Sequence, residues 1–103
     1  MDAMVQDKLA EVTELCLKRG VRRLALFGSA AERVDGRKPN DLDFLVEFGP
    51  MLPAKQADSF FGLQGDLERL FGCPVDLVEP GAIRNPYFRE AVEESKVVLY
   101  DEP

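Results

Sequence analysis

The chain has 103 residues, 46% of them apolar and 31% charged, and a formal net charge of −6 at pH 7. This length and composition predict one globular domain, residues 1–103, burying roughly two thirds of the surface that its unfolded chain would expose. The sequence contains no histidine, which excludes Ser-His-Asp catalysis and histidine-ligated zinc. The acidic balance argues against a protein that binds nucleic acid directly, because such proteins normally carry a basic surface.

The sequence also indicates where the protein resides. No run of about 18 uncharged apolar residues occurs, so we expect no membrane span and no signal peptide, and we expect a cytoplasmic protein. The two cysteines, Cys16 and Cys73, do not have the spacing of a metal or redox motif. Their apolar neighbours favour buried free thiols.

The N-terminal segment is predicted to form a helix, because apolar residues recur there at helical spacing: Val5, Leu9, Val12 and Cys16. Asp2 can cap this helix and Gly20 can end it. Residues 21–27, VRRLALF, form the first predicted strand, and residues 29–33, SAAER, open a short second helix. Residues 34–40 are predicted to form a loop because they contain Gly, Pro and Asn.

The middle of the chain is predicted to form a strand and a long helix. The strand, residues 41–48 (DLDFLVEF), places its alternate apolar side chains on one face: Leu42, Phe44, Val46 and Phe48. A loop follows at residues 49–57. Asp58 can then cap a helix that runs through Phe71 and stops at Gly72.

The C-terminal third completes the predicted sheet. Residues 74–80, PVDLVEP, form a third strand, and Asn85 with Pro86 can cap and start a helix that ends at about Glu94. Residues 96–100, KVVLY, fit an edge strand. This order of elements predicts an α/β (α+β) domain, with a small mixed sheet and helices mainly on one face.

Two aspartates, Asp41 and Asp43, stand two residues apart on the second predicted strand and therefore point to the same face. Two ionised carboxylates in one site repel each other unless a cation lies between them. A third strand parallel to the second would add Asp76 to this group. A first strand antiparallel to the second would bring Gly28 and Ser29 to the same edge. The pattern predicts a divalent metal with an anion held at the Gly-Ser turn.

The acidic residues also have structural interpretations. Asp43 and Asp76 interrupt strands that otherwise fit a core, where unpaired charge is costly, so we favour a functional role for both. Asp41, at the end of a loop, fits a cap or a solvated charge equally well. Glu47 and Glu79 are interpreted as solvent-facing residues at strand ends.

The basic and aromatic residues leave further alternatives open. One basic group is interpreted as a solvated helix end: Lys18, Arg19, Arg22 and Arg23. The second group faces the predicted phosphate site and either contacts a triphosphate or remains surface charge: Arg33, Arg37 and Lys38. Phe60 and Phe61 are predicted to be mostly core, with one of them available to a partner.

The segments LFGSAAER, NDLDFLVEF and PVDLVEP, taken in this order, resemble the minimal nucleotidyltransferases (MNT type) of the DNA polymerase β superfamily. The shared pattern is a strand ending in Gly-Ser, an Asp-x-Asp strand and a third Asp on a later strand, and the resemblance covers about residues 5–100. It implies the polymerase β palm-like fold and two Mg²⁺ ions bound by three catalytic, metal-ligating carboxylates: Asp41, Asp43 and Asp76. It also implies a site for the nucleotide phosphates: Gly28, Ser29 and Arg33.

The resemblance further implies an activity and a partner. Small members of the family often pair with a HEPN-domain toxin, and some block it by transferring AMP from ATP to a tyrosine. We therefore expect a Mg²⁺-dependent nucleotidyltransferase that acts as the antitoxin of a HEPN toxin and modifies a hydroxyl of that partner. A second interpretation is a catalytically weakened module that neutralises its partner by occlusion, and transfer to a nucleic-acid end is a third. The oligomeric state is left open.

The sequence departs from the family pattern near the phosphate site. Ala30, Ala31, Glu32 and Arg33 follow Gly-Ser, and Asn40 precedes Asp41, where the family commonly has an Arg-Gly pair and a Ser. Two interpretations follow. Either Arg33 replaces the family arginine from a shifted position, or the nucleotide site is weakened while the carboxylates are kept.

Overall fold

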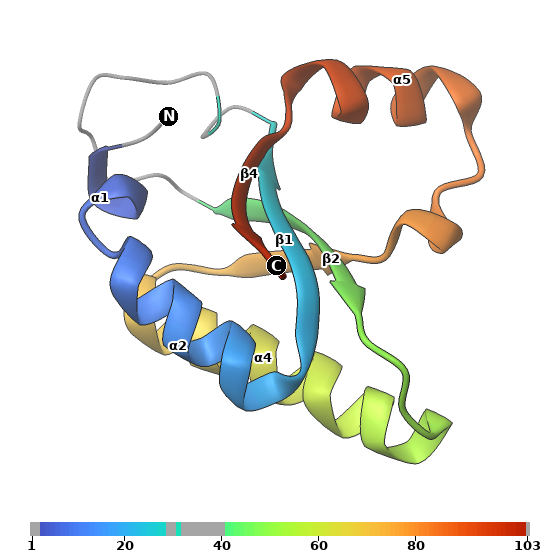
Figure 1. Cartoon of the computed structure of the whole chain (residues 1–103). Coiled ribbons are helices and arrows are strands. Elements are labelled where there is room, and N and C mark those ends of the chain that lie inside the picture. Colours follow the sequence, from blue (N-terminus) through green and yellow to red (C-terminus); the bar gives the residue numbers. More distant parts are fainter. Residues whose placement is uncertain (1–2, 29–30, 32–40, 103) are drawn as a thin grey trace.

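Figure 1 shows the computed structural model, which describes residues 3–28, 31 and 41–102. In chain order its elements are α1 (Ala3–Gln6), α2 (Leu9–Arg19), β1 (Val21–Phe27), β2 (Leu42–Phe48), α4 (Pro53–Phe71), β3 (Val75–Val78), the 3-10 helix η1 (Pro80–Ala82), α5 (Pro86–Ser95) and β4 (Val97–Asp101). The short helix predicted at residues 29–33 lies outside the described residues, apart from Ala31, as does the loop predicted at residues 34–40.

The four strands form one mixed sheet in the order β3-β2-β1-β4. Strand β1 runs antiparallel to both β2 and β4, whereas β3 runs parallel to β2 and is reached through α4. The predicted mixed sheet and its parallel pair are therefore confirmed, as is the C-terminal edge strand. The register pairs Asp43 with Asp76 on β3 and with Phe27 on β1.

Helices α2 and α4 lie together on one side of the sheet (Figure 1) and enclose the larger part of the core. Of the four apolar residues predicted on one face of β2, three are fully buried, namely Leu42, Phe44 and Val46, and Phe48 is half-buried. The Phe44 ring stacks on that of Phe71 from α4, with centroids 6.2 Å apart. Among the described residues, no helix combines the length and the apolar character needed to cross a membrane.

The opposite face of the sheet carries a smaller apolar cluster: Ala25, Phe27, Leu45, Ile83 and Val92. Ile83 follows η1 and Val92 belongs to α5, so the C-terminal helical segment covers part of this face. Helices lie mainly on one face, as predicted, and α5 is the exception. Because side chains alternate along β2, Asp43 lies on the same face as Leu45.

Two predicted helices differ from the structure, the first in its continuity and the second in its start. The N-terminal helix is divided, since α1 ends at Gln6 and α2 begins at Leu9, while the proposed cap Asp2 lies outside the described residues. Helix α4 begins at Pro53 rather than at Asp58, which lies inside it. A proline is well suited to the first helical turn, where its missing N–H needs no partner.

The other predicted helix boundaries are confirmed. Gly20 and Gly72 follow the last residues of α2 and α4. The Asn85 side chain accepts hydrogen bonds from the backbone N–H groups of Tyr87 and Phe88, at 2.9 and 3.2 Å, and so caps α5. Cys16 and Cys73 are buried and form no disulfide, as expected, and burial raises the pKa of the Cys16 thiol to about 12.

An ion pair joins α2 to α4. The Arg19 Nε donates to Asp66 Oδ2 at 2.9 Å, and Arg69 donates to Asp66 Oδ1 at 2.6 Å. The hydrogen bond from Arg19 is the main reason that the pKa of the buried Asp66 lies below its ordinary value, although burial opposes it. Arg19 is therefore a structural residue, and its interpretation as part of a solvated helix end is wrong.

Gly62 makes room for this ion pair. A Cβ placed at Gly62 would lie 2.3 Å from Arg19 Nη1, whereas one at Gly65 would meet only Arg69 Nη1, at 3.4 Å. A Gly→Ala change in a helix usually stabilises by about 1 kcal/mol. At Gly62 the added methyl group displaces the guanidinium and removes a charged hydrogen bond that contributes about 1.5 to 3 kcal/mol.

We therefore expect Gly62→Ala to destabilise the protein by about 0.5 to 2 kcal/mol and Gly65→Ala to leave it unchanged or more stable. Urea unfolding of the two variants beside the wild type measures both effects. Equal midpoints for the two variants would contradict the role given to Gly62.

Candidate active site

Three carboxylates meet on the sheet. Asp41 immediately precedes β2, Asp43 belongs to β2, and Asp76 belongs to β3. Each contributes one oxygen, and these oxygens all lie within 4.8 Å of one another. The parallel register that pairs Asp43 with Asp76 produces this arrangement. The predicted convergence of the three aspartates is confirmed.

Among the residues that the structure describes, none supplies a cation to the carboxylate cluster. Asp41 and Asp76 are exposed and Asp43 is half-buried, and within the described residues no Lys or Arg forms an ion pair with any of them. Burial is the largest cause that raises the pKa of Asp43. The neighbouring charges of Asp41 and Asp76, and a side-chain hydrogen bond with Asp76, raise it further. The described residues therefore leave the mutual repulsion of the three carboxylates uncompensated.

Gly28 ends β1 directly beside the cluster. Its φ is +76°, and a Cβ at this position would lie 2.8 Å from Asp43 Oδ2. Both the backbone conformation and the close approach favour glycine. The Ala31 N–H donates to the Gly28 carbonyl at 3.2 Å.

The other residues expected at the phosphate site are Ser29 and Arg33, with Arg37 and Lys38 nearby, and all four lie outside the described residues. Of the predicted phosphate-binding residues, only Gly28 is therefore placed. The roles of Ser29 and Arg33 stay predictions.

A pocket of about 420 Å³ lies beside the carboxylates, between the sheet and α5. Its lining combines Gly28, Asp43 and Asp76 with the apolar side chains of Phe27 and Phe88. These two rings meet edge to face, with centroids 6.1 Å apart. Phe88 has no local signal in the sequence, because its place in the site depends on how α5 packs on the sheet.

The two glutamates interpreted as solvent-facing differ from each other. Glu47 forms a long surface ion pair with Arg23, at 3.7 Å, and both side chains are 42% exposed. Glu79 is half-buried and its Oε1 accepts a hydrogen bond from Gln56 Nε2 at 2.7 Å. Glu79 is therefore only partly solvent-facing, since it also contacts α4.

The carboxylate cluster has the chemistry of a site for hard divalent cations. Magnesium ions prefer oxygen ligands and are usually held by one or two carboxylates together with substrate phosphates. The cluster offers such oxygens within 4.8 Å of one another, from Asp41, Asp43 and Asp76. Their mutual repulsion favours the binding of a positive charge. Mg²⁺ with a nucleotide phosphate fits this donor set.

Comparison with known proteins identifies the family. A family model described as "Nucleotidyltransferase domain" matches residues 9–99, most of the chain. The chain belongs to this family. The nucleotidyltransferase is similar to two candidate protein adenylyltransferases of Methanocaldococcus jannaschii, with 40% and 34% identity over 82 residues. In both cases the matched segment covers 80% of this chain and 80% of the relative.

Solved structures narrow the family assignment. A candidate minimal nucleotidyltransferase superposes with a TM-score of 0.65 at 30% identity, covering 94% of this chain and 95% of the other. The chain is thus a minimal nucleotidyltransferase.

More distant structures share the fold. A chain from the complex of a tri-AMPylated Shewanella oneidensis HEPN toxin with its MNT antitoxin superposes with a TM-score of 0.64 at 18% identity, covering 93% and 71% of the two chains. A chain from a toxin-antitoxin structure with AMP-PNP gives 0.66 at 19% identity, covering 90% and 73%.

The raised pKa of Asp43 predicts the sign of a stability change. A carboxyl whose pKa is higher in the folded state than in the unfolded chain lowers stability once the pH rises through that interval. We expect metal-free Asp43→Asn to be more stable than the wild type at pH 7. The gain should shrink as the pH falls towards 3.8, the ordinary aspartate pKa.

Denaturant titrations of both proteins in EDTA across this pH range measure the effect. Asp66→Asn is the matched comparison. Because the pKa of Asp66 is lowered, this change should destabilise the protein at pH 7, with a loss that shrinks only as the pH falls below the ordinary aspartate value. A metal-free Asp43→Asn variant that is less stable than the wild type at pH 7 would mean that Asp43 is a structural residue.

Proposed function

We propose that this minimal nucleotidyltransferase transfers AMP from ATP to a hydroxyl group of a partner protein, as the antitoxin of a HEPN-type toxin. The observation that carries the proposal is the convergence of Asp41, Asp43 and Asp76 beside Gly28. Three carboxylates that repel one another can bind divalent cations, and Gly28 leaves room beside them. This arrangement is typical of sites that transfer phosphoryl or nucleotidyl groups with bound cations.

The similar proteins support AMP as the group and a protein as the acceptor. The M. jannaschii relatives are named as candidate protein adenylyltransferases. Among the structures of similar fold, one contains an MNT antitoxin with a tri-AMPylated HEPN toxin, and another contains AMP-PNP. These proteins motivate ATP as the substrate and a HEPN-type toxin as the partner of this chain.

The exposure of the site also favours a large acceptor. Asp41 and Asp76 are exposed, so a hydroxyl carried on the surface of another protein can reach them. The buried thiols of Cys16 and Cys73, which form no disulfide, fit the reducing cytoplasm in which we place the reaction.

Each site residue has a defined role in this mechanism. Asp41 and Asp43 would hold two Mg²⁺ ions, with Asp76 completing the ligand set, and Gly28, Ser29 and Arg33 would contact the nucleotide phosphates. When bound, the two ions supply positive charge to the attacking and leaving oxygens of an in-line displacement. Gly28 contributes by allowing the chain to turn without displacing the Asp43 carboxylate.

The transfer itself exchanges one phosphorus–oxygen bond for another. The acceptor hydroxyl oxygen attacks the α-phosphorus of ATP and forms a new P–O bond, while the bond from the α-phosphorus to the bridging oxygen breaks and pyrophosphate leaves with that electron pair. The exposed Asp76 carboxylate accepts the hydroxyl proton. Asp43, whose pKa is raised, stays ionised through its cation, since a bound positive charge offsets the neighbouring carboxylates.

Transfer of label from α-³²P-ATP in the presence of Mg²⁺, with the partner that co-purifies with the chain, tests this proposal. We expect label and an added AMP mass on the partner, and a loss of at least about a hundredfold in rate for Asp43→Asn and Asp76→Asn. Asp58→Asn, an exposed aspartate on α4, is the matched control and should transfer at the wild-type rate.

The other outcomes separate the alternatives. Label in RNA would replace the protein acceptor by a nucleic-acid end. If no label appears anywhere but the partner remains bound and inactive, the chain acts by occlusion and the enzymatic proposal is wrong.

A further inference from the structure

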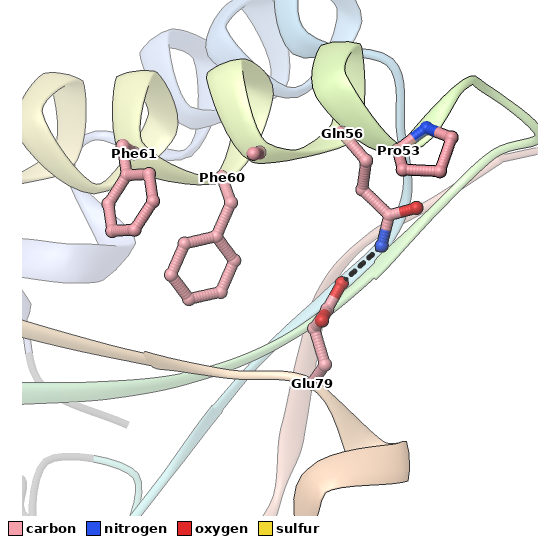
Figure 2. A pocket seen from close by; sticks show the side chains of 6 residues that line it. Pro53, Gln56, Phe60, Phe61 and Glu79 are labelled. Atoms are coloured by element: carbon pink, nitrogen blue, oxygen red, sulfur yellow. Dashed lines mark hydrogen bonds between the residues drawn. The ribbon is translucent and has the colours of Figure 1, made fainter.

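A second pocket lies on the other side of the edge strand β3, away from the carboxylates. It has a volume of about 360 Å³ and is lined by Pro53, Gln56, Ala57, Phe60, Phe61 and Glu79. The first five belong to α4. Figure 2 shows Glu79 opposite the labelled α4 side chains, on the segment after β3. Neither the nucleotide chemistry nor the core uses this pocket.

Two aromatic rings form one wall of the pocket (Figure 2). Phe60 is half-buried and its ring lies 6.5 Å from that of Phe48, which anchors it to the core. Phe61 is 68% exposed, and its ring meets that of Phe60 edge to face at 5.3 Å. The sequence interpretation left one of these two residues for a partner, and the structure places Phe61 at the surface.

The opposite wall of the pocket carries a carboxylate that lacks a cation. Gln56 Nε2 donates a hydrogen bond to Glu79 Oε1. Within the described residues, no Lys or Arg forms an ion pair with Glu79. Glu79 is the only charged residue among the six that line the pocket. An aromatic wall facing a half-buried anion is complementary to a cation on an apolar stem.

We propose that this pocket binds an arginine side chain presented by the partner protein. A guanidinium stacks on aromatic faces and donates in a planar fork to carboxylates, while its aliphatic stem covers apolar surface. The protein is acidic, with a net charge of −6, which favours a partner with basic residues.

The position of the pocket links it to the proposed reaction. Glu79 follows Asp76 by three residues, and the chain continues in an extended conformation from β3 to Glu79. The two residues therefore lie about 10 Å apart along the chain, with their side chains on opposite faces. Strand β3 is at the edge of the sheet. A partner segment that crosses this edge can place an arginine in the pocket while its hydroxyl faces the carboxylates. This link rests on the proposed function, whereas arginine binding itself does not.

A titration of the ¹⁵N-labelled protein with the peptide acetyl-Gly-Arg-Gly-amide tests the pocket, in Mg²⁺ buffer at about 0.15 M salt to screen general attraction. We expect saturable shifts of the Gln56, Phe61 and Glu79 amide signals. Glu79→Gln, which can keep the bond to Gln56, should weaken binding about tenfold. Phe61→Leu, which keeps an apolar side chain but removes the ring, should weaken it at least about threefold.

Two controls make the titration decisive. Leu17→Ala removes an apolar side chain of similar exposure, 65%, on α2 and should bind the peptide like the wild type. The matched citrulline peptide lacks the positive charge and should bind at least about tenfold more weakly. Equal binding of the two peptides, shifts confined to the carboxylate site, or variants that bind like the wild type would overturn the proposal.

Transfer to the co-purified partner tests the link to the reaction. Glu79→Gln should raise the KM for the partner protein about tenfold. Any decrease in kcat should be smaller than this change, and the KM for ATP should equal that of the wild type. An unchanged KM for the partner would overturn the docking role. If the wild type transfers no AMP, the proposed function fails, and the peptide titration still decides whether the pocket binds arginine.

Discussion

The repulsion between three carboxylates held within 4.8 Å is the interaction on which the site depends. The backbone imposes it, because the hydrogen-bonded register of β2 and β3 fixes Asp43 beside Asp76, and neither can move away without breaking the sheet. Burial of Asp43 and the two neighbouring charges raise its pKa together. In the absence of a cation, the folded protein therefore carries an electrostatic cost at the site that we propose for nucleotidyl transfer.

Two aspartates of the same chain illustrate how the surroundings decide the role. Asp66 is more deeply buried than Asp43, yet the hydrogen bonds from Arg19 and Arg69 lower its pKa, and it joins two helices. Asp43 has no such partner within the described residues, and its pKa is raised. A buried carboxylate with a guanidinium is structural, whereas one without it is available to a cation brought by the substrate.

The sequence was sufficient for the features that follow from periodicity and chain order. Alternation along β2 placed Asp41 and Asp43 together, and the parallel crossover through α4 added Asp76. The features that the sequence did not predict depend on tertiary packing. Asp66 has no local signal that distinguishes it from a surface aspartate of α4, and Arg19 fits a helix end equally well until the two helices pack. Phe88 and Glu79 acquire their roles only when α5 and α4 pack on the sheet.

We infer that the carboxylate cluster requires a divalent cation, and the titration of Asp43 measures this requirement most directly. In ¹³C NMR of the metal-free protein, the Asp43 carboxyl signal should titrate above the ordinary aspartate pKa of 3.8. Addition of Mg²⁺ should lower this pKa below 3.8, since the bound ion favours the ionised form. An Asp43 pKa that is already at or below 3.8 without metal, or that Mg²⁺ leaves unchanged, would contradict the claim.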